Sequence, residues 1–390
     1  MTPAARVAAA IEILDDVLEG VAAEKALTSW ARHSRFAGSK DRAAIRDLVF
    51  DALRHRQSYA WLGGLETGRG LMAGACRANE MDLADVFSGI GHAPLPLTPE
   101  EIADFPEVDQ IPDEKERDFP EWAFSALTEA HGDKAAPIAE ALRHRAPVFV
   151  RVNLRKTTVK DAASQLAKET IETEPHPLSD TALRVLTNPR RLHLSDAYKS
   201  GLIEIQDAGS QYLADNLPGF DGMRSLDYCA GGGGKSLALA AKFEGTFVAS
   251  DISERRMTDI SERANRAGVT IETRSQEELS EIELFDLVLC DAPCSGSGAW
   301  RRSPDAKWRF KDSDLDGIVK VQRDILSSAK MLVVESGVLA YATCSLFDAE
   351  NVDQTNWFLS ENPDWIMIGS QQITPLNGGD GFYLSLLKRR

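Results

Sequence analysis

The stretch SLDYCAGGGGKS, residues 225–236, decides the fold of the second half of the chain. Its apolar start predicts a short buried strand, and the glycines Gly231–Gly234 predict a tight turn into a helix that begins near Ser236. Glycines at a strand-to-helix turn let the backbone approach a ligand closely, at the edge where open α/β sheets bind their ligands. A plain tight turn without a ligand is the alternative.

Strand-like and helix-like runs alternate on both sides of this turn. Strands are expected at residues 245–250, 285–290, 338–342 and 381–387, and helices at residues 236–242, 254–267 and 319–334. Alternation of this kind predicts a parallel sheet with right-handed crossovers. We therefore expect an α/β, Rossmann-like sheet domain at residues 206–390.

The first half of the chain has a different pattern. Apolar residues recur at three- and four-residue spacing up to about residue 75, which predicts an α-helical N-terminal domain over residues 1–90. Prolines and glycines then mark an acidic connector over residues 91–118. A helix after Pro120, followed by alternating strand residues from Val148 to Val152, predicts a small α+β module over residues 119–205. The expected protein is multidomain.

Length and composition agree with a multidomain globular protein. The chain has 390 residues, of which 43% are hydrophobic and 27% charged. No apolar run approaches the ~18 residues of a membrane helix, and the N-terminus carries acids inside its apolar stretch, unlike a secretory signal. Five cysteines are an odd number and are unevenly spread, so no disulfide framework is expected. We expect a reduced, cytoplasmic protein without a membrane anchor.

The formal net charge of −16 argues weakly against a nucleic-acid partner, but the charges are not evenly spread. Residues 80–140 hold 16 acids and three bases, whereas residues 141–160 hold six bases and no acid. A second basic run, residues 301–311, is interleaved with aromatic residues. Both runs are candidates for contact with RNA phosphates and bases. A solvated face is the alternative for the first run, and a loop lying over an apolar patch is the alternative for the second.

Three cofactor classes compete for the glycine turn. A phosphate-binding loop needs a glycine where Cys229 stands, and a dinucleotide fingerprint needs a different spacing of its third glycine. S-adenosylmethionine remains, because its class I methyltransferases place an acid at the end of the first strand, as Asp227 does, before a looser glycine loop.

Asp251, twenty residues past Gly231, follows the second strand and can accept both hydroxyls of an adenosine ribose. Capping the next helix is its alternative role, and the two roles are compatible. The candidate cofactor-binding residues are Cys229, Ala230, Gly231, Gly232, Gly233, Gly234, Lys235, Asp251 and Asp291.

Two cysteines follow strand ends on the same predicted sheet edge. Cys294 lies in LCDAPCSGSG, residues 289–298, and Cys344 lies in YATCS, residues 341–345. A lone cysteine is usually a small buried hydrophobe, but two thiols that converge on one cofactor crevice are harder to explain in that way. No CxxC pair and no nearby histidine would complete four zinc ligands, so no metal is expected.

The motifs DYCAGGGGKS, LCDAPCSGSG and YATCS, in this order, resemble those of the Sun/NOP-type family of RNA cytosine-5 methyltransferases. QDAGSQ at residues 206–211 resembles the segment that leads into the family's catalytic domain, and the N-terminal helices resemble the NusB-like RNA-binding domain of its bacterial ribosomal-RNA members.

The chain departs from the family's usual motifs at two places. Gly231-Gly232 replace the usual Ala-Pro, and the acid expected near the adenine is not evident, since Arg274 or Ser275 stands there.

The resemblance implies methylation of C5 of a cytosine in structured RNA, with S-adenosylmethionine as donor and 16S ribosomal RNA as the expected substrate. It implies that Cys344 attacks C6, that Cys294 serves in the loss of the C5 proton, and that Asp291 binds the N3/N4 edge of the cytosine. We expect the cationic sulfonium and Lys235 to favour the thiolate.

Three other readings of the chain stay open. A transfer RNA is the alternative substrate. A non-catalytic RNA-binding ribosome-assembly factor is the alternative class, although binding alone requires neither thiol. DNA methylation is disfavoured, because DNA enzymes typically draw the nucleophile from the Pro-Cys loop alone. We expect a monomer.

Overall fold

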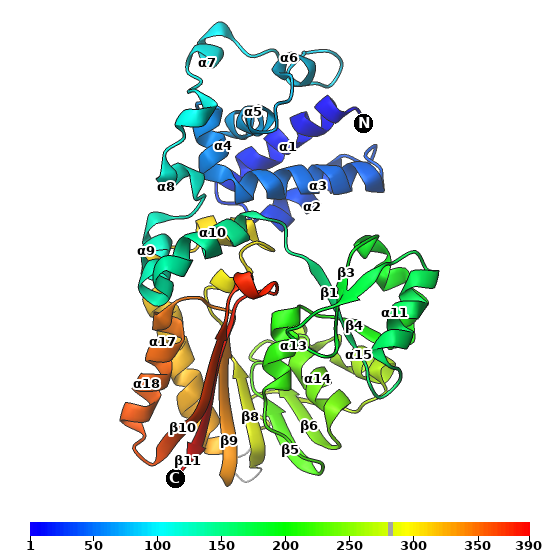
Figure 1. Ribbon diagram of the computed structural model, residues 1–390, viewed down its shortest axis with the longest axis vertical. Coiled ribbons are helices and arrows are strands. Elements are labelled where there is room, and N and C mark those ends of the chain that lie inside the picture. Colours follow the sequence, from blue (N-terminus) through cyan, green and yellow to red (C-terminus); the bar gives the residue numbers. More distant parts are fainter. Residues whose placement is uncertain (280–283) are drawn as a thin grey trace. The chain divides into compact units, whose positions relative to one another are not determined.

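The computed structural model describes residues 1–279 and 284–390 (Figure 1). The chain divides into two compact units. The helical unit comprises Met1–Arg145 and Trp300–Lys311, and the sheet unit comprises Ala146–Ala299 and Asp312–Arg390. The boundary after Arg145 does not coincide with the predicted start of the α+β module at residue 119. The second basic run folds with the helical unit, although sheet-unit residues flank it on both sides.

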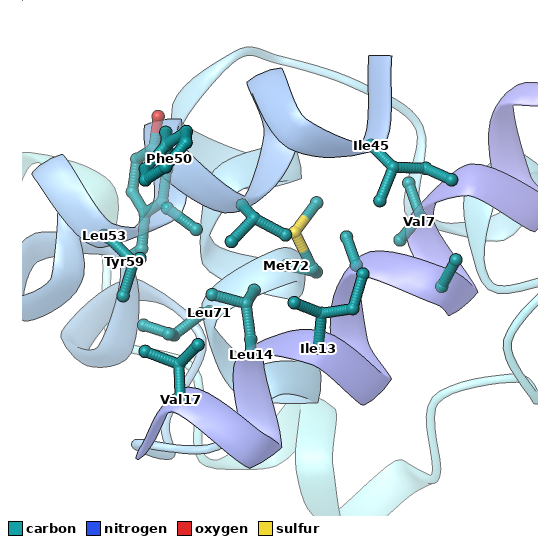
Figure 2. Close-up of a cluster of buried hydrophobic side chains, with 14 of the residues drawn as sticks. Val7, Ile13, Leu14, Val17, Ile45, Phe50, Leu53, Tyr59, Leu71 and Met72 are labelled. Carbon is teal, nitrogen blue, oxygen red and sulfur yellow. The ribbon is translucent and has the colours of Figure 1, made fainter. Parts of the chain in front are cut away.

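The helical unit is built around one apolar core. Its first helices are α1 (Pro3–Leu18), α2 (Ala23–His33), α3 (Ser39–Arg54), α4 (Arg56–Leu62), α5 (Gly68–Ala78) and α6 (Leu83–Val86). Figure 2 shows Leu14 of α1, Ile45 of α3 and Met72 of α5 among the buried side chains of this core. Helices α4 and α5 approach closely at a glycine, because a Cβ atom at Gly74 would lie 1.9 Å from the carbonyl oxygen of Tyr59. Helical structure in this region was predicted and is confirmed.

The acidic connector is folded against these helices. It contains α7 (Pro99–Ala103), the 3-10 turn η1 (Val108–Gln110) and α8 (Asp113–Glu116). Arg69 of α5 pairs with Glu101 at 2.6 Å and donates to the carbonyl of Leu95 at 3.0 Å. Arg77 donates to the carbonyl of Pro106 at 2.6 Å. Arginines of the core helices therefore fix the backbone of a segment whose composition suggested a linker.

Two helices and a strap complete the helical unit. They are α9 (Glu121–His131), which begins after Pro120 as predicted, the turn η2 (Gly132–Lys134), and α10 (Ala135–Arg143). The residues Trp300–Lys311, called the strap below, contain the short helix α16 (Pro304–Arg309). The indole of Trp300 packs on Phe119 and Trp122, with ring centroids 5.5 and 6.5 Å apart.

The sheet unit begins with a small antiparallel sheet in the order β2-β3-β1-β4. Its strands are β1 (Val148–Val152), β2 (Thr173–Pro175), β3 (Ala182–Val185) and β4 (Ile203–Ile205). Helices α11 (Val159–Lys168) and α12 (Asp196–Lys199) contribute Leu166 and Ala197 to a common core with Val150 of β1. The strand β1 agrees with the sequence prediction. The 3-10 turn η3 (Pro189–Leu194) precedes α12.

The large sheet has seven strands in the order β10-β11-β9-β8-β5-β6-β7. Five are parallel to one another: β5 (Met223–Asp227), β6 (Gly245–Ser250), β7 (Glu272–Arg274), β8 (Phe285–Asp291) and β9 (Val333–Thr343). The last two, β10 (Trp365–Ile373) and β11 (Phe382–Arg389), are antiparallel to each other, and β11 also pairs in the antiparallel direction with β9. The sheet is therefore mixed, and the prediction of a parallel sheet was wrong at this end, because a hairpin rather than a crossover joins the last two strands.

Helices cover both faces of the large sheet. On one face lie α13 (Ala208–Asp215), α14 (Gly234–Lys242) and α15 (Ile260–Ala267), and on the other lie α17 (Asp312–Ala329) and α18 (Val352–Glu361). Alternate residues of β8 serve the two cores, since Leu287 packs in the first and Val288 in the second. Four short 3-10 turns, η5 (Ser297–Ala299), η6 (Lys330–Leu332), η7 (Asp348–Glu350) and η8 (Pro375–Asn377), lie in the connections.

Two predicted helices differ from the observed ones. The helix expected over residues 254–267 is split into the turn η4 (Glu254–Met257) and α15, and the helix expected over residues 319–334 ends at Ala329, before Val333 begins β9. Within the described residues, no helix is long and apolar enough to cross a membrane.

Candidate active site

The predicted site residues gather at the carboxyl edge of the parallel strands. Asp227 ends β5, Asp251 follows β6, Asp291 ends β8, and Cys344 follows β9. Because these strands are parallel neighbours, their carboxyl ends meet at one edge of the sheet. The topology therefore assembles the residues that the sequence predicted as one site.

The glycine turn is held by the residue that follows β6. Gly231 and Gly233 have φ angles of +53° and +75°, in the left-handed region that favours glycine. The amide of Gly231 donates to Oδ2 of Asp251 at 2.9 Å, and the amide of Ser253 donates to Oδ1 of the same carboxylate at 2.9 Å. Asp251 is almost fully buried, and Arg256 pairs with it at 3.2 Å. Its carboxylate thus fixes both the turn and the start of the next segment, but the N-cap of the following turn at Glu254–Met257 is Ser253, so Asp251 does not have the capping role considered above.

Asp227 offers an unused acceptor beside this turn. Its Oδ2 accepts a hydrogen bond from the hydroxyl of Ser236 at 2.7 Å, whereas its buried Oδ1 has no partner among the described residues. Burial, helped by the charge of Asp291, raises the pKa of Asp227 to about 6. A cationic amine, such as that of a bound methionine moiety, would supply the missing partner.

Lys235 brings a positive charge to the same edge. Its Nζ donates to Oδ2 of Asp291 at 2.5 Å, and its side chain is almost fully buried. Burial alone would lower the pKa of Lys235, but the charge and hydrogen bond of Asp291, with a further contribution from Cys344, raise it above its usual range. The ammonium therefore stays charged, and it favours negative charge on its neighbours.

The two predicted cysteines are adjacent in space. The Sγ atoms of Cys294 and Cys344 are 3.4 Å apart, and both side chains are partly accessible. The hydrogen bond to Cys344, together with burial, raises the pKa of Cys294 well above its usual range. Burial also raises the pKa of the fully buried Cys290 and that of Cys229. Those two thiols are unsuited to act as nucleophiles.

Two family models match the chain. The one described as 16S rRNA methyltransferase RsmB/F matches residues 217–388, and the ferredoxin-like domain of the same family matches residues 119–192. The "Ribosomal RNA small subunit methyltransferase B" of Photorhabdus laumondii is 33% identical over 285 residues, which cover 70% of this chain and 66% of that protein. Its counterpart in Klebsiella pneumoniae is 33% identical over 286 residues, again 70% of this chain and 66% of the relative. The chain belongs to the RsmB/F family of 16S rRNA methyltransferases.

Solved structures agree with this membership at the level of the fold. The crystal structure of PH0851 is similar over 100% of this chain and 99% of that chain, with a TM-score of 0.77 and 21% identity. The structure of NSun6 from Pyrococcus horikoshii with SFG is similar over 70% of this chain and 98% of that chain, with a TM-score of 0.60 and 18% identity. The predicted fold class, a class I methyltransferase sheet with a helical N-terminal part, is confirmed. The NusB-like character of that part stays a prediction.

S-adenosylmethionine is the cofactor of this RsmB/F-family chain. The residues at the edge fit it, because a positive-φ glycine turn permits close approach and a buried carboxylate oxygen of Asp227 lacks a partner. Among the described residues, no cluster of metal-ligating side chains is found.

Some side chains of the first basic run form hydrogen bonds within the protein. Arg151 is buried and donates to Oε1 of Gln206 at 3.0 Å and to the carbonyl of Gly234 at 3.2 Å. Arg155 donates to the carbonyls of Ala240 and Phe243 at the end of α14, at 2.8 and 2.7 Å. The expectation of RNA contact is contradicted for Arg151, because its side chain is buried, and stays a prediction for Arg155, which is exposed.

The second basic run is likewise partly structural. Lys307 is buried and donates to the carbonyl of Asp118 at 2.5 Å. The indole Nε1 of Trp308 donates to the carbonyl of Leu53 at 2.6 Å. The proposed RNA contact is therefore wrong for Lys307. The strap's exposed cations are Arg302, Arg309 and Lys311.

The sequence analysis missed a group of buried polar residues behind the thiols. Ser295, Ser345 and Glu350 are buried and hydrogen-bonded to one another. A single sequence offers no signal for them, because an isolated glutamate in a polar loop looks like any solvated acid.

Proposed function

We propose that this protein transfers the methyl group of S-adenosylmethionine to C5 of a cytosine in 16S ribosomal RNA, through a covalent bond between Cys344 and C6. The observation that carries the proposal is the 3.4 Å separation of the Cys294 and Cys344 sulfur atoms at the edge that also holds the glycine turn. Two thiols fit a reaction in which one forms a bond and the other helps to break it. Curated relatives of the chain are small-subunit ribosomal RNA methyltransferases.

Residues of three strand ends would hold the cofactor. S-adenosylmethionine supplies an electrophilic methyl group when it is bound. The turn Gly231–Gly234 would let the backbone approach it, and the carboxylate of Asp251 would accept the ribose hydroxyls. Oδ1 of Asp251 accepts one backbone N–H and keeps a lone pair for a hydroxyl, whereas Oδ2 accepts from Gly231 and also pairs with Arg256. Oδ1 of Asp227 is the free acceptor for the ammonium group.

Cys344 would begin the reaction as a thiolate. The electron pair of its sulfur forms the bond to C6, and the former C5=C6 electrons make C5 nucleophilic toward the methyl group. Lys235 favours this thiolate, since the two groups interact electrostatically. Asp291, held by Lys235 at 2.5 Å, would bind the N3/N4 edge of the cytosine and favour protonation of the ring.

Cys294 would end the reaction. After methyl transfer C5 carries both a methyl group and a proton, and a base must take the proton so that the C5=C6 bond re-forms and expels the Cys344 thiolate. Cys294 would act as this base in its thiolate form, after its own proton has passed to solvent water, and its raised pKa makes that thiolate the stronger base.

Methyl transfer with purified protein tests the proposal. The protein is incubated with radiolabelled S-adenosylmethionine and with 16S ribosomal RNA, small-subunit particles or transfer RNA, and bisulfite sequencing locates the modified base. We expect label in 16S ribosomal RNA at one cytosine that resists bisulfite. Label in transfer RNA alone would overturn the substrate, and RNA binding without any label would favour an assembly factor. A cytoplasmic location follows from a ribosomal RNA substrate.

A further inference from the structure

One buried carboxylate joins the loops that carry the two thiols. The side chain of Glu350 is fully buried. Its Oε1 accepts from the backbone amide of Ser295 at 2.7 Å, and its Oε2 accepts from the hydroxyls of Ser295 and Ser345, each at 2.5 Å. Ser295 directly follows Cys294, and Ser345 directly follows Cys344. A single side chain is therefore bonded to the residue after each thiol.

Glu350 is itself fixed by its surroundings. Its backbone carbonyl accepts from the hydroxyl of Tyr341 on β9 at 2.6 Å. Gln322 of α17 donates from Nε2 to Oε1 of Glu350 at 3.2 Å and to the carbonyl of Pro293 at 3.0 Å. Tyr341 thus ties the backbone of Glu350 to β9, and Gln322 ties its carboxylate to α17.

The two cysteine loops depend on this carboxylate to different degrees. Cys344 follows directly after β9, where Thr343 pairs with Tyr383 of β11 in the sheet. Cys294 lies three residues beyond the end of β8, in a loop whose ends are tied to β9 and its following turn by the amides of Ala292 and Gly298. The middle of that loop is held through Pro293 and Ser295, by Gln322 and Glu350. Loss of Glu350 would therefore loosen Cys294 more than Cys344.

The donors around the carboxylate are an amide N–H, two hydroxyls and a side-chain amide, all of them neutral. A buried charge stabilised only by hydrogen bonds is costly to disturb and sensitive to geometry. Together with the hydrogen bond to Cys344 and with burial, the charge of Glu350 contributes to the raised pKa of Cys294. The same group thus affects both the place and the protonation of the second thiol.

We propose that Glu350 is a positioning residue that sets the spacing of the two thiols and is needed mainly for release of the methylated RNA by Cys294. The inference rests on the proposed function. Glu350 touches neither reacting atom; it acts through Ser295 and Ser345. A loosened Cys294 would leave the attack by Cys344 largely intact and would slow removal of the C5 proton.

The test compares Glu350→Gln with wild type, Cys294→Ser and the control Glu361→Gln, the same change at an exposed glutamate. Full-length proteins are incubated with 16S ribosomal RNA and radiolabelled S-adenosylmethionine, and three quantities are measured. These are turnover, the fraction of protein covalently bound to RNA on a denaturing gel, and cofactor affinity by calorimetry. In Glu350→Gln we expect turnover to fall about tenfold or more and the covalent fraction to rise several-fold, as in Cys294→Ser. Cofactor affinity and the Glu361→Gln control should match wild type.

Ser295→Ala keeps the test decisive if Glu350→Gln does not fold. It removes one hydroxyl donor and leaves the carboxylate in place, and we expect the same direction with a smaller change. Unchanged turnover in the folded variants, or a fall in turnover without any rise of the covalent fraction, would overturn the role of Glu350. Absence of label with the wild-type protein would instead overturn the proposed function.

Discussion

The loop Asp291–Gly298, for which we propose a catalytic role, and the strap Trp300–Lys311 are neighbours in the chain, yet they belong to different units. In the loop, polar groups bond to other polar groups of the sheet edge, as Asp291 does with Lys235. In the strap, cations and indoles bond to backbone carbonyls of the helical unit, as Lys307 does with Asp118. A basic, aromatic run that lies next to a proposed catalytic motif in the sequence is therefore not necessarily part of the substrate site. Its hydrogen-bond donors can instead be bonded to the protein's own carbonyl groups.

Serine substitutions of the two thiols test the loop side of this contrast and should have the largest effects. Cys344→Ser is expected to abolish methyl transfer and to form no covalent RNA species, because attack on C6 comes first. Cys294→Ser is expected to form the species and fail to resolve it, which a shifted band on a denaturing gel would show. A band in Cys344→Ser instead would reverse the two roles. If both variants only lose stability, by about 1–3 kcal/mol for a buried polar group, the thiols are structural.

The substitution Asp251→Ala tests cofactor binding at the same sheet edge, and we expect it to have a smaller effect than the cysteine substitutions. The variant loses the acceptor of Gly231 and Ser253 as well as the one proposed for the ribose. We expect cofactor affinity to weaken by about 1.5–3 kcal/mol, roughly 10- to 100-fold. Calorimetry with S-adenosylmethionine measures it, and the exposed Asp316→Ala serves as control. Equal affinities in the two variants would contradict the assignment.

The pH dependence of stability tests the strap side. Burial lowers the pKa of Lys307 from 10.5 to about 7. Between these values the unfolded chain binds a proton at this site and the folded chain does not, so the contribution of Lys307 to stability rises with pH. Relative to Lys307→Met, wild type should gain up to about 1.4 kcal/mol per pH unit between about pH 7 and 9 in denaturant unfolding. The exposed Lys320→Met should follow wild type at every pH. A flat difference for Lys307→Met would mean that the ammonium is solvated.

The exposed cations of the strap should give the smallest effect. Arg302→Gln combined with Lys311→Gln removes two charges at exposed positions. If they contact RNA phosphates, the dissociation constant for 16S ribosomal RNA should rise about threefold, and the slope of log affinity against log salt should fall by up to about 1.5. Filter binding across a salt series measures both, with Lys320→Gln as control. An unchanged slope would leave the strap with a structural role alone.

The parts of the fold that the sequence predicted are those with strong local patterns. Strands β6 and β8 were expected because each contains a run of apolar residues. The turn before α14 was expected because consecutive glycines favour a turn over a helix or a strand. Strand β10 was missed because its apolar run, Trp365–Ile368, is short and is followed by polar residues, and most residues of the strand are exposed. Strand β7 was missed because it has only three residues, none of them buried.

The candidate site divides in the same way. Asp251, Asp291, Cys294 and Cys344 could be predicted because each directly follows or ends a recognisable strand or motif. Glu350 could not be predicted. Its proposed role depends on two serines that are 50 residues apart in the sequence and meet at its carboxylate oxygens only in the folded protein. The structural use of Arg151 could not be predicted either, since its acceptors lie 55 and 83 residues away along the chain. When the hydrogen-bond acceptors of a charged side chain are so far away along the chain, the sequence gives no sign that the side chain is paired.

The strap also has a consequence for synthesis on the ribosome. The helical unit begins at residue 1, but its last piece, with the buried indole of Trp300, is made only after most of the sheet strands. At translation rates of about 5–20 residues per second, the nascent helical unit waits roughly 10 to 30 seconds for the segment that covers its apolar surface. During that interval the surface is open to chaperones. A fragment cut at the boundary after Arg145 would reproduce this unfinished state permanently, and the other fragment would carry the aromatic side chains of the strap with nothing to pack against.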